Sequence, residues 1–187
     1  DQLASGVAPT DSAEYYLAGG TALALQLGHR QSLDFDFFSS QKDTAKLIIP
    51  YLENFPDFIL RESDSNTVHA ELSAVKLSFI GGYRYPTLDK LIRATGFQIA
   101  SVLDIALMKL LAVSHRAALR DYLDLALIIR DHIPLEELLR SAPKKYGNSF
   151  NPMIPLRALV TFDDIQEETE KPILLDKSLE SSWQEIL

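Results

Sequence analysis

Two glycines and two aspartates have the types and the spacing to bind a phosphate group and a metal ion. Gly19 and Gly20 stand directly before the apolar stretch TALALQL, and Asp34 and Asp36 follow in the segment DFDFF. Glycines at the start of a helix let the backbone approach phosphate oxygens, and the free N–H groups there favour anions. Carboxylates at positions i and i+2 of a strand face the same way and can hold Mg²⁺ through oxygen ligands. The pattern therefore predicts an anion-binding turn close to a metal-binding carboxylate pair.

The elements that position these residues can be predicted from the spacing of apolar side chains. We expect a strand over 15–18, a turn at 19–20, a helix from an N-cap at Thr21 to a C-terminal glycine at Gly28, and a strand over 32–38. In the second strand the residues alternate, so both aspartates should face away from the buried side chains Leu33, Phe35 and Phe37. The helix would lead the chain back to the strand that carries the carboxylates.

Further along the chain the pattern changes from strands to helices. We expect a helix over 44–54, strands over 58–62, 67–72 and 75–80, and helices over 99–113, 121–131 and, with breaks at prolines, 135–187. The fold class is therefore α+β. We expect an α/β core at residues 1–86 and a helical region at 87–187 packed on it, with a cleft between the two where a site would lie.

Composition and charge limit the classes of function. The chain has 187 residues, of which 47% are hydrophobic and 24% charged, as in ordinary globular proteins. It has no cysteine, which excludes disulfides and thiolate metal sites, and neither a long apolar run nor a signal-peptide pattern, which favours a cytoplasmic protein. The formal net charge of -8 argues against a broad nucleic-acid-binding surface but leaves room for a local basic site.

A second group of charged residues lies in the segment from 101 to 129. Lys109 interrupts the apolar run IALM-K-LLAV, and a buried lysine is costly unless it meets an anion or extends to solvent. If the segment is helical, Lys109, Arg116 and Arg120 share one face within about 40°. Asp121 and Asp124 follow immediately. The pattern indicates either an anion-binding face or a surface stripe of charge pairs.

His29 and Arg30 directly follow the first expected helix and precede the carboxylate strand. Arg30 can position a phosphate or orient one of the two aspartates. Alternatively, both residues can stabilise the C-terminus of the helix as cations. We favour the first interpretation for Arg30 and the second for His29.

These blocks resemble a known family. The stretch YLAGGTALALQLGHR with DFDFF after it is similar to the signature of the nucleotidyltransferase superfamily, and more narrowly to the AbiEii/AbiGii-type toxins of bacterial toxin–antitoxin and phage-defence systems. The strand VKLSF with YRYP after it, and the Lys-Arg-Asp-Asp segment, resemble the same family. The resemblance implies a polymerase-beta-like mixed sheet followed by a helical region. It also implies Mg²⁺-dependent transfer of a nucleoside monophosphate from a nucleoside triphosphate to an acceptor hydroxyl such as that of tRNA, and a cognate antitoxin as protein partner.

The resemblance also assigns roles to individual residues. Asp34 and Asp36 would bind the metal ion and take part in catalysis. The expected nucleotide-binding residues are Gly19, Gly20, Thr21, Arg30, Lys109 and Arg116. Lys109 would also support catalysis, and Asp121 and Asp124 would act as base, metal ligand or orienting groups.

One position departs from the family pattern. Nucleotidyltransferases usually carry a third carboxylate on a neighbouring strand, and the matching position in VKLSF is Ser78, with Glu71 on the preceding strand as the nearest substitute. A nucleotide-binding module without transfer activity, working through protein contacts, is therefore an alternative. Transfer to a cationic small molecule such as an antibiotic is a third interpretation, which suits the acidic charge. An RNA acceptor would need a local basic path, for which Arg116, Arg120 and Lys144-Lys145 are candidates.

Overall fold

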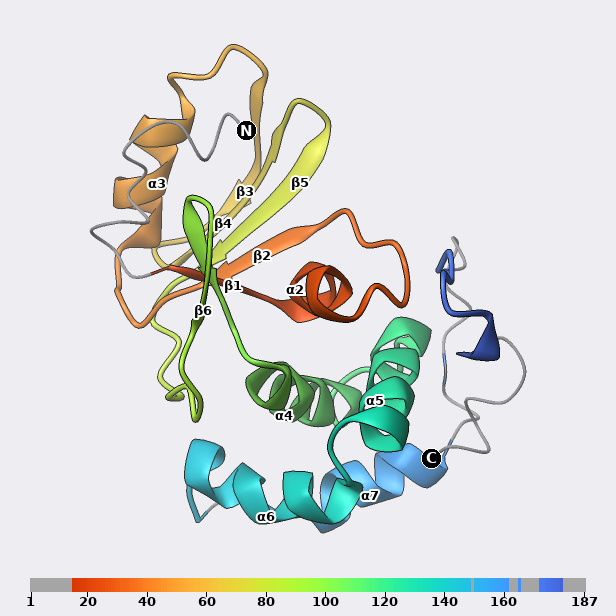
Figure 1. Ribbon diagram of the computed structural model, residues 1–187. Coiled ribbons are helices and arrows are strands. Elements are labelled where there is room, and N and C mark those ends of the chain that lie inside the picture. The colour runs from red at the N-terminus through yellow and green to blue at the C-terminus, as the bar shows by residue number, and fades with distance from the viewer. Residues whose placement is uncertain (1–14, 149, 162–164, 166–171, 180–187) are drawn as a thin grey trace. The chain divides into compact units, whose positions relative to one another are not determined.

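A computed structural model describes residues 15–148, 150–161, 165 and 172–179 of the chain (Figure 1). The chain divides into two units that alternate along the sequence. Of the described residues, the sheet unit comprises 15–22, Leu33–Tyr85 and Lys90–Ala100. The helical unit comprises Leu23–Ser32, Pro86–Asp89 and the described residues from Ser101 onward.

Within the described residues, seven strands form one mixed sheet in the order β3-β4-β5-β2-β1-β7-β6. The strands are β1 (Tyr16–Ala18), β2 (Phe35–Phe38), β3 (Phe58–Ser63), β4 (Thr67–Leu72), β5 (Val75–Ile80), β6 (Ile92–Ala94) and β7 (Phe97–Ile99). The β2–β5 and β1–β7 pairs are parallel, and the other neighbours are antiparallel. The sheet with its helices is the α+β arrangement that the sequence predicts.

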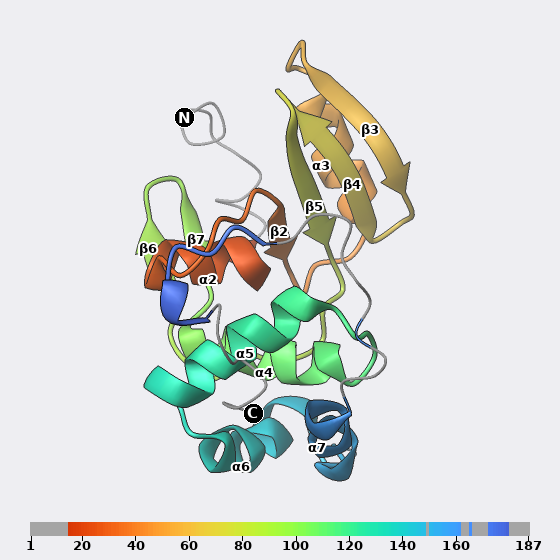
Figure 2. The ribbon, with the colours of Figure 1, turned by 90° about the vertical axis from the view of Figure 1, so that its right-hand side faces the viewer.

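One face of the sheet is covered by α3 (Thr44–Leu52), which packs against β3, β4 and β5 (Figure 2). The helix buries Ile48 and Leu52, and β5 buries Leu77 and Phe79. Because side chains alternate along a strand, the residues between them on β5 face the other way. Ser78 therefore faces away from Leu77 and Phe79, as the sequence predicts, and shares that face with Asp36 on β2 and His69 on β4.

Helix α2 (Gly19–Leu27) follows β1 without a linker. Gly19 has a φ of +70°, which the abrupt change from strand to helix requires and which glycine adopts at low cost. Thr21 is not the N-cap that the sequence suggests, because the helix has already begun at Gly19. The predicted C-terminal glycine is confirmed, since Gly28 has a φ of +63° and its N–H donates to the carbonyl of Ala24. The division between the two units falls inside α2.

The helical unit contains α4 (Val102–Val113), α5 (Leu119–Asp131), α6 (Leu135–Tyr146) and α7 (Met153–Val160), followed by a short 3₁₀ turn at Lys177–Leu179. Helix α4 packs against the other three helices. Its apolar side chains and those of α5 form the core, including Ile105, Leu107, Leu110, Leu125 and Ile128. None of the helices in the described part of the chain is long and apolar enough to cross a membrane.

The structure differs from the sequence-based expectation in several places. Residues 92–99 lie in the region expected to be helical but form the β6–β7 hairpin, whose strands have three residues each and are too short to show a periodic pattern. Helix α4 therefore begins at Val102 rather than at residue 99. Leu33, expected in the core, lies before β2 and is 75% exposed. The boundary at residue 86 stays a prediction, and most of the expected C-terminal helices beyond Thr161 lie outside the described residues.

Candidate functional site

The carboxylate pair lies at the centre of the sheet. Asp36 belongs to β2, opposite Ala18 on β1 and Ser78 on β5, and Asp34 lies just before the strand begins. Both aspartates are half-buried, whereas Phe37, the residue after Asp36 on β2, is buried. The predicted alternation of outward aspartates and inward phenylalanine is therefore present at Asp36 and Phe37.

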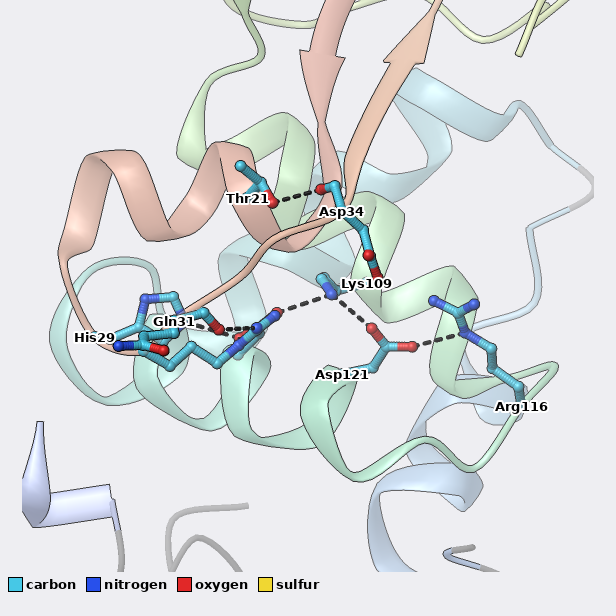
Figure 3. Close-up of polar contacts among 9 residues, drawn as sticks. Thr21, His29, Gln31, Asp34, Lys109, Arg116 and Asp121 are labelled. Carbon is cyan, nitrogen blue, oxygen red and sulfur yellow. Dashed lines mark hydrogen bonds and ion pairs between the residues drawn. The ribbon is translucent and has the colours of Figure 1, made fainter. Parts of the chain in front are cut away.

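The first turn of α2 lies directly against these carboxylates. A Cβ atom added to Gly19 would lie 2.8 Å from Oδ2 of Asp36, closer than real Cβ atoms approach another atom. The hydroxyl of Thr21 donates a 2.5 Å hydrogen bond to the backbone carbonyl of Asp34, which fixes the helix start to the strand (Figure 3). The sheet unit thus brings together all five residues predicted from the glycine and aspartate motif, namely Gly19, Gly20, Thr21, Asp34 and Asp36.

The donor set of this motif suits a magnesium ion that also binds phosphate. Mg²⁺ is commonly held by one or two carboxylates together with substrate phosphate oxygens and water. Asp34 and Asp36 supply two carboxylates, and the missing Cβ of Gly19 leaves room beside one of them. No group of three or more His, Asp or Glu side chains positioned to hold a metal ion occurs within residues 15–148, 150–161, 165 and 172–179. The motif therefore fits a metal ion whose coordination is completed by a substrate.

A row of polar side chains extends from Asp36 across the neighbouring strands. Ser78 lies opposite Asp36, and His69 on β4 lies opposite Ser78. The Nδ1 of His69 and the Oγ of Ser78 are 3.2 Å apart. Glu71, the expected substitute for a third carboxylate, lies outside this row because it pairs with Lys76. Its carboxylate accepts hydrogen bonds of 2.6 and 3.2 Å from the guanidinium of Arg61.

The predicted Lys-Arg-Asp-Asp group forms a buried ion network in the helical unit. The Nζ of Lys109 lies 2.6 Å from Oδ1 of Asp121 and 2.8 Å from Oδ2 of Asp124. Arg116 places its Nε 2.8 Å from the other oxygen of Asp121 (Figure 3). The sequence-based interpretation placed Lys109 and Arg116 on one face of a continuous helix. This is wrong, because α4 ends at Val113 and α5 begins at Leu119, so that Arg116 lies in the turn between them. The turn between the helices carries it back to Asp121.

Arg30 and His29 belong to the same network. The guanidinium of Arg30 donates from Nε and Nη2 to the two oxygens of Asp124, at 2.7 and 2.9 Å. The Nε2 of His29 lies 2.8 Å from Oδ1 of the same carboxylate, and His29 is 1% exposed. Backbone hydrogen bonds to residues 173–175 hold this segment in place. Sequence reasoning missed these contacts, since 94 residues separate Arg30 from Asp124.

The network fixes the charge of its members. Burial opposes the charged form of Lys109, but Asp124 and Asp121 more than offset this and hold the pKa of the lysine above its ordinary value. Burial likewise opposes ionisation of Asp124, yet Lys109, Arg30 and His29 hold the pKa of its carboxyl far below the usual range. The pKa of Asp121 is lowered in the same way by Lys109 and Arg116. Carboxylates with lowered pKa values are weak proton acceptors.

A second buried ion pair was not predicted. Lys145 on α6 donates to Oδ1 of Asp104 on α4 and to the carbonyl of Pro86, both at 2.7 Å. The carboxylate of Asp104 also accepts hydrogen bonds from the backbone of Leu88 and from the N-cap residue Ser101. Lys145 is 3% exposed and therefore cannot belong to the surface path suggested for RNA, whereas its neighbour Lys144 is exposed. A serine three residues before an aspartate is the sequence signal that marks the capping part of this cluster.

The chain is similar to known proteins both in sequence and in structure. A protein of Aquifex aeolicus (strain VF5), described as uncharacterized, is 34% identical over 178 residues, which cover 92% of this chain and 82% of that protein. The solved structure of MenT4, a nucleotidyltransferase toxin from Mycobacterium tuberculosis H37Rv, has a TM-score of 0.59 at 17% identity and covers 92% of this chain and 73% of its own. JHP933 from Helicobacter pylori has a TM-score of 0.50 at 18% identity and 84% coverage of both chains.

The structural likeness to MenT4 confirms the expected nucleotidyltransferase-like fold. The family model described as "Nucleotidyl transferase AbiEii toxin, Type IV TA system" matches residues 2–187, nearly the whole chain. The chain therefore belongs to the AbiEii family of nucleotidyltransferase toxins.

Proposed function

We propose that this protein is a Mg²⁺-dependent nucleotidyltransferase that moves a nucleoside monophosphate from a nucleoside triphosphate to a hydroxyl of RNA, with tRNA as the acceptor. The observation that carries the proposal is the close approach of Gly19 to the carboxylate of Asp36, where a Cβ atom would lie 2.8 Å from Oδ2. A backbone without a side chain beside a metal-binding carboxylate is what a bound triphosphate requires, because its oxygens must reach both the amide N–H groups and the metal ion.

The residues of the sheet unit supply binding and orientation. Asp34 and Asp36 would hold Mg²⁺, which neutralises phosphate charge and polarises the phosphoryl group when it is bound. The N–H groups at Gly19 and Gly20 would bind phosphate oxygens. Thr21 keeps the two parts of this motif together through its bond to the carbonyl of Asp34.

The residues of the helical unit have different tasks in this proposal. Arg116 would contact phosphate, since 61% of its side chain is exposed while its Nε is fixed by Asp121. Lys109 would act through the two aspartates that it binds, because its ammonium is buried. Arg30 would likewise act through Asp124, because its Nε and Nη2 already donate hydrogen bonds to that carboxylate.

We also propose a cognate antitoxin as protein partner, on the ground that the matching family is described as part of a type IV toxin–antitoxin system. Nucleoside triphosphates and tRNA are both cytoplasmic, so the compartment is the one favoured by the sequence. The net charge of -8 requires that RNA contact be local, and exposed basic residues such as Arg116 and Lys144 are available for it.

The test is transfer of label from each α-labelled nucleoside triphosphate to total tRNA in the presence of Mg²⁺. We expect labelled RNA with the wild-type protein and none above background with Asp36→Asn, which removes one charged metal ligand but keeps the side-chain shape. The matched control is Asp89→Asn, an exposed aspartate outside the motif, which should label RNA as the wild type does. Absence of labelled RNA with the wild-type protein would contradict the proposal.

The position of Ser78 opposite Asp36 favours a second candidate function, a nucleotide-binding module that does not transfer. In that case nucleoside triphosphates bind in a Mg²⁺-dependent manner, the Asp36→Asn variant loses the binding, and no acceptor is labelled. If instead label moves to a cationic antibiotic and not to tRNA, the acceptor is a small molecule. The same labelled nucleotides distinguish these outcomes.

A further inference from the structure

The row formed by Asp36, Ser78 and His69 contains a hydrogen-bonded serine–histidine pair beside the metal-binding carboxylate. Ser78 lies opposite Asp36 on the parallel neighbour strand, and His69 lies opposite Ser78 on the next strand. Neighbouring strands are about 4.8 Å apart, so the hydroxyl of Ser78 comes next to the position of a substrate held at Asp36. His69 and Ser78 are half-buried, on the face of the sheet that α3 does not cover.

This pair stands where a proton acceptor is needed. Transfer requires that the acceptor hydroxyl lose its proton, and the strand position opposite Asp36 holds Ser78 rather than a carboxylate. Asp121 and Asp124 are weak proton acceptors because their pKa values are lowered by Lys109 and its neighbours. Glu71 pairs with Arg61 and lies outside the row. Imidazole, in contrast, is the side chain that normally exchanges protons between about pH 5 and pH 8.

We propose that Ser78 and His69 form a proton relay that takes the place of the missing third carboxylate. The inference rests on the proposed nucleotidyl transfer. The oxygen of the acceptor hydroxyl forms a bond to the α-phosphorus as the bond from that phosphorus to pyrophosphate breaks. The proton of the acceptor hydroxyl passes to the Oγ of Ser78, whose own proton passes to Nδ1 of His69, and pyrophosphate leaves with the electrons of the broken bond. Nε2 carries the ring proton before the step, so that Nδ1 can accept.

The charged groups around His69 come from four strands. Glu62 on β3 lies opposite His69, and Asp36 lies beyond Ser78 in the same row. Glu71, on the same face two residues further along β4, is paired with Arg61 and lies opposite Lys76 on β5. Asp64, at the end of β3, has a pKa that is lowered by hydrogen bonds to Asn66 and Thr67 and by the nearby His69. Four of these neighbours, Asp36, Glu62, Asp64 and Glu71, are carboxylates, and two, Arg61 and Lys76, are cations.

The first part of the test compares His69→Gln and Ser78→Ala with the wild type in the tRNA-labelling reaction at saturating nucleotide and Mg²⁺. General-base catalysis contributes about 10²- to 10⁴-fold, so each variant should lose at least about 10²-fold in kcat. The double variant should lose no more than the single ones, because the two residues act as a unit. Mg²⁺-dependent nucleotide binding should be unchanged in all three. His132→Gln, an exposed histidine at the end of α5, is the control and should keep wild-type activity.

The second part asks whether the role is proton transfer or folding. The wild-type rate should rise with pH and level off as one group loses a proton, and His69→Gln should lose this limb of the profile. Adding Ser78→Asp to His69→Gln places a carboxylate opposite Asp36 and should restore at least about 10-fold of the lost rate, a gain that a merely structural histidine cannot produce.

Wild-type transfer that His69→Gln leaves intact would overturn the relay and leave the proposed function standing. Loss of activity with an unchanged pH profile and no rescue by Ser78→Asp would also overturn it. Failure of the wild-type protein to transfer any nucleotide would overturn both.

Discussion

The Nζ of Lys109 lies 2.6 Å from Oδ1 of Asp121, and only 7% of the lysine side chain and none of the aspartate is exposed. From the sequence we expected a buried Lys109 to meet an anion. In the structure it contacts two carboxylates of the chain itself. Asp124 is the second of them and ties Lys109 to Arg30 and His29. The buried ions of the helical unit therefore stabilise the fold of that unit, whatever further role they have.

Replacing Lys109 by methionine should lower the free energy of unfolding by roughly 3–5 kcal/mol, because two buried carboxylates lose a shared cation. Urea denaturation measures this change. The control is Lys46→Met, which removes an exposed lysine that is 3.2 Å from Asp43 and should cost less than about 1 kcal/mol. Equal stabilities of the two variants would show that the buried network does not stabilise the protein.

Stability should fall steeply in acid. The pKa values of Asp121 and Asp124 are lower in the folded protein than in the unfolded chain. Their stabilising contribution is therefore complete above about pH 4 and is lost as the pH falls from there toward the folded-state values. Urea midpoints measured from about pH 5 down to about pH 3 should decrease, and the slope should be shallower in Asp121→Asn, which cannot titrate at that position. The same slope in both proteins would contradict the assignment.

Gly19→Ala should impair both stability and nucleotide binding. The left-handed conformation costs a non-glycine residue about 1–2 kcal/mol, and the new Cβ would also collide with Asp36. Gly28→Ala is the matched control, because Gly28 has a similar φ of +63° but nothing within 4 Å of its added Cβ. Gly19→Ala should therefore be the less stable variant in urea. It should also weaken Mg²⁺-dependent nucleotide binding, measured by titration calorimetry, while Gly28→Ala binds as the wild type does.

Two adjacent lysines on α6 should respond very differently to the same substitution. Lys145→Met leaves the buried carboxylate of Asp104 without its cation and should cost roughly 3–5 kcal/mol of unfolding free energy. Lys144→Met changes an exposed side chain and should stay within about 0.5 kcal/mol of the wild type. Thermal or urea unfolding of the pair decides the matter. If Lys145→Met were as stable as Lys144→Met, the contacts of Lys145 and Asp104 with residues 86–89 would not stabilise the protein.

Local patterns in the sequence predicted the local parts of the structure. Period-two alternation gave the outward aspartate at Asp36 and the outward Ser78, and β4 and β5 have the predicted bounds. The paired glycines predicted the sharp bend between β1 and α2, although the helix begins at Gly19 and not after an N-cap at Thr21. These features depend on residues that are close in the chain.

Contacts between residues far apart in the sequence could not be predicted from such local patterns. The contact of Arg30 with Asp124 and the order of the strands depend on which distant segments meet, and single residues carry no signal for that. The β6–β7 hairpin was missed because three residues are too few to display a period. The sequence alone suggests that Lys145 is an exposed cation like Lys144. The burial of Lys145 follows only from its contact with Asp104 on α4, which the sequence does not reveal.

The central claim, nucleotidyl transfer directed by the Gly19–Asp36 motif, is tested most directly by following two labels on one nucleotide. Wild-type protein, tRNA and Mg²⁺ are incubated in parallel with α-labelled and γ-labelled nucleoside triphosphate, with Asp36→Asn beside each reaction. The account predicts that the α-label enters RNA, that the γ-label appears only in pyrophosphate, and that Asp36→Asn does neither. The γ-label in RNA, or equal α-labelling by Asp36→Asn, would contradict it.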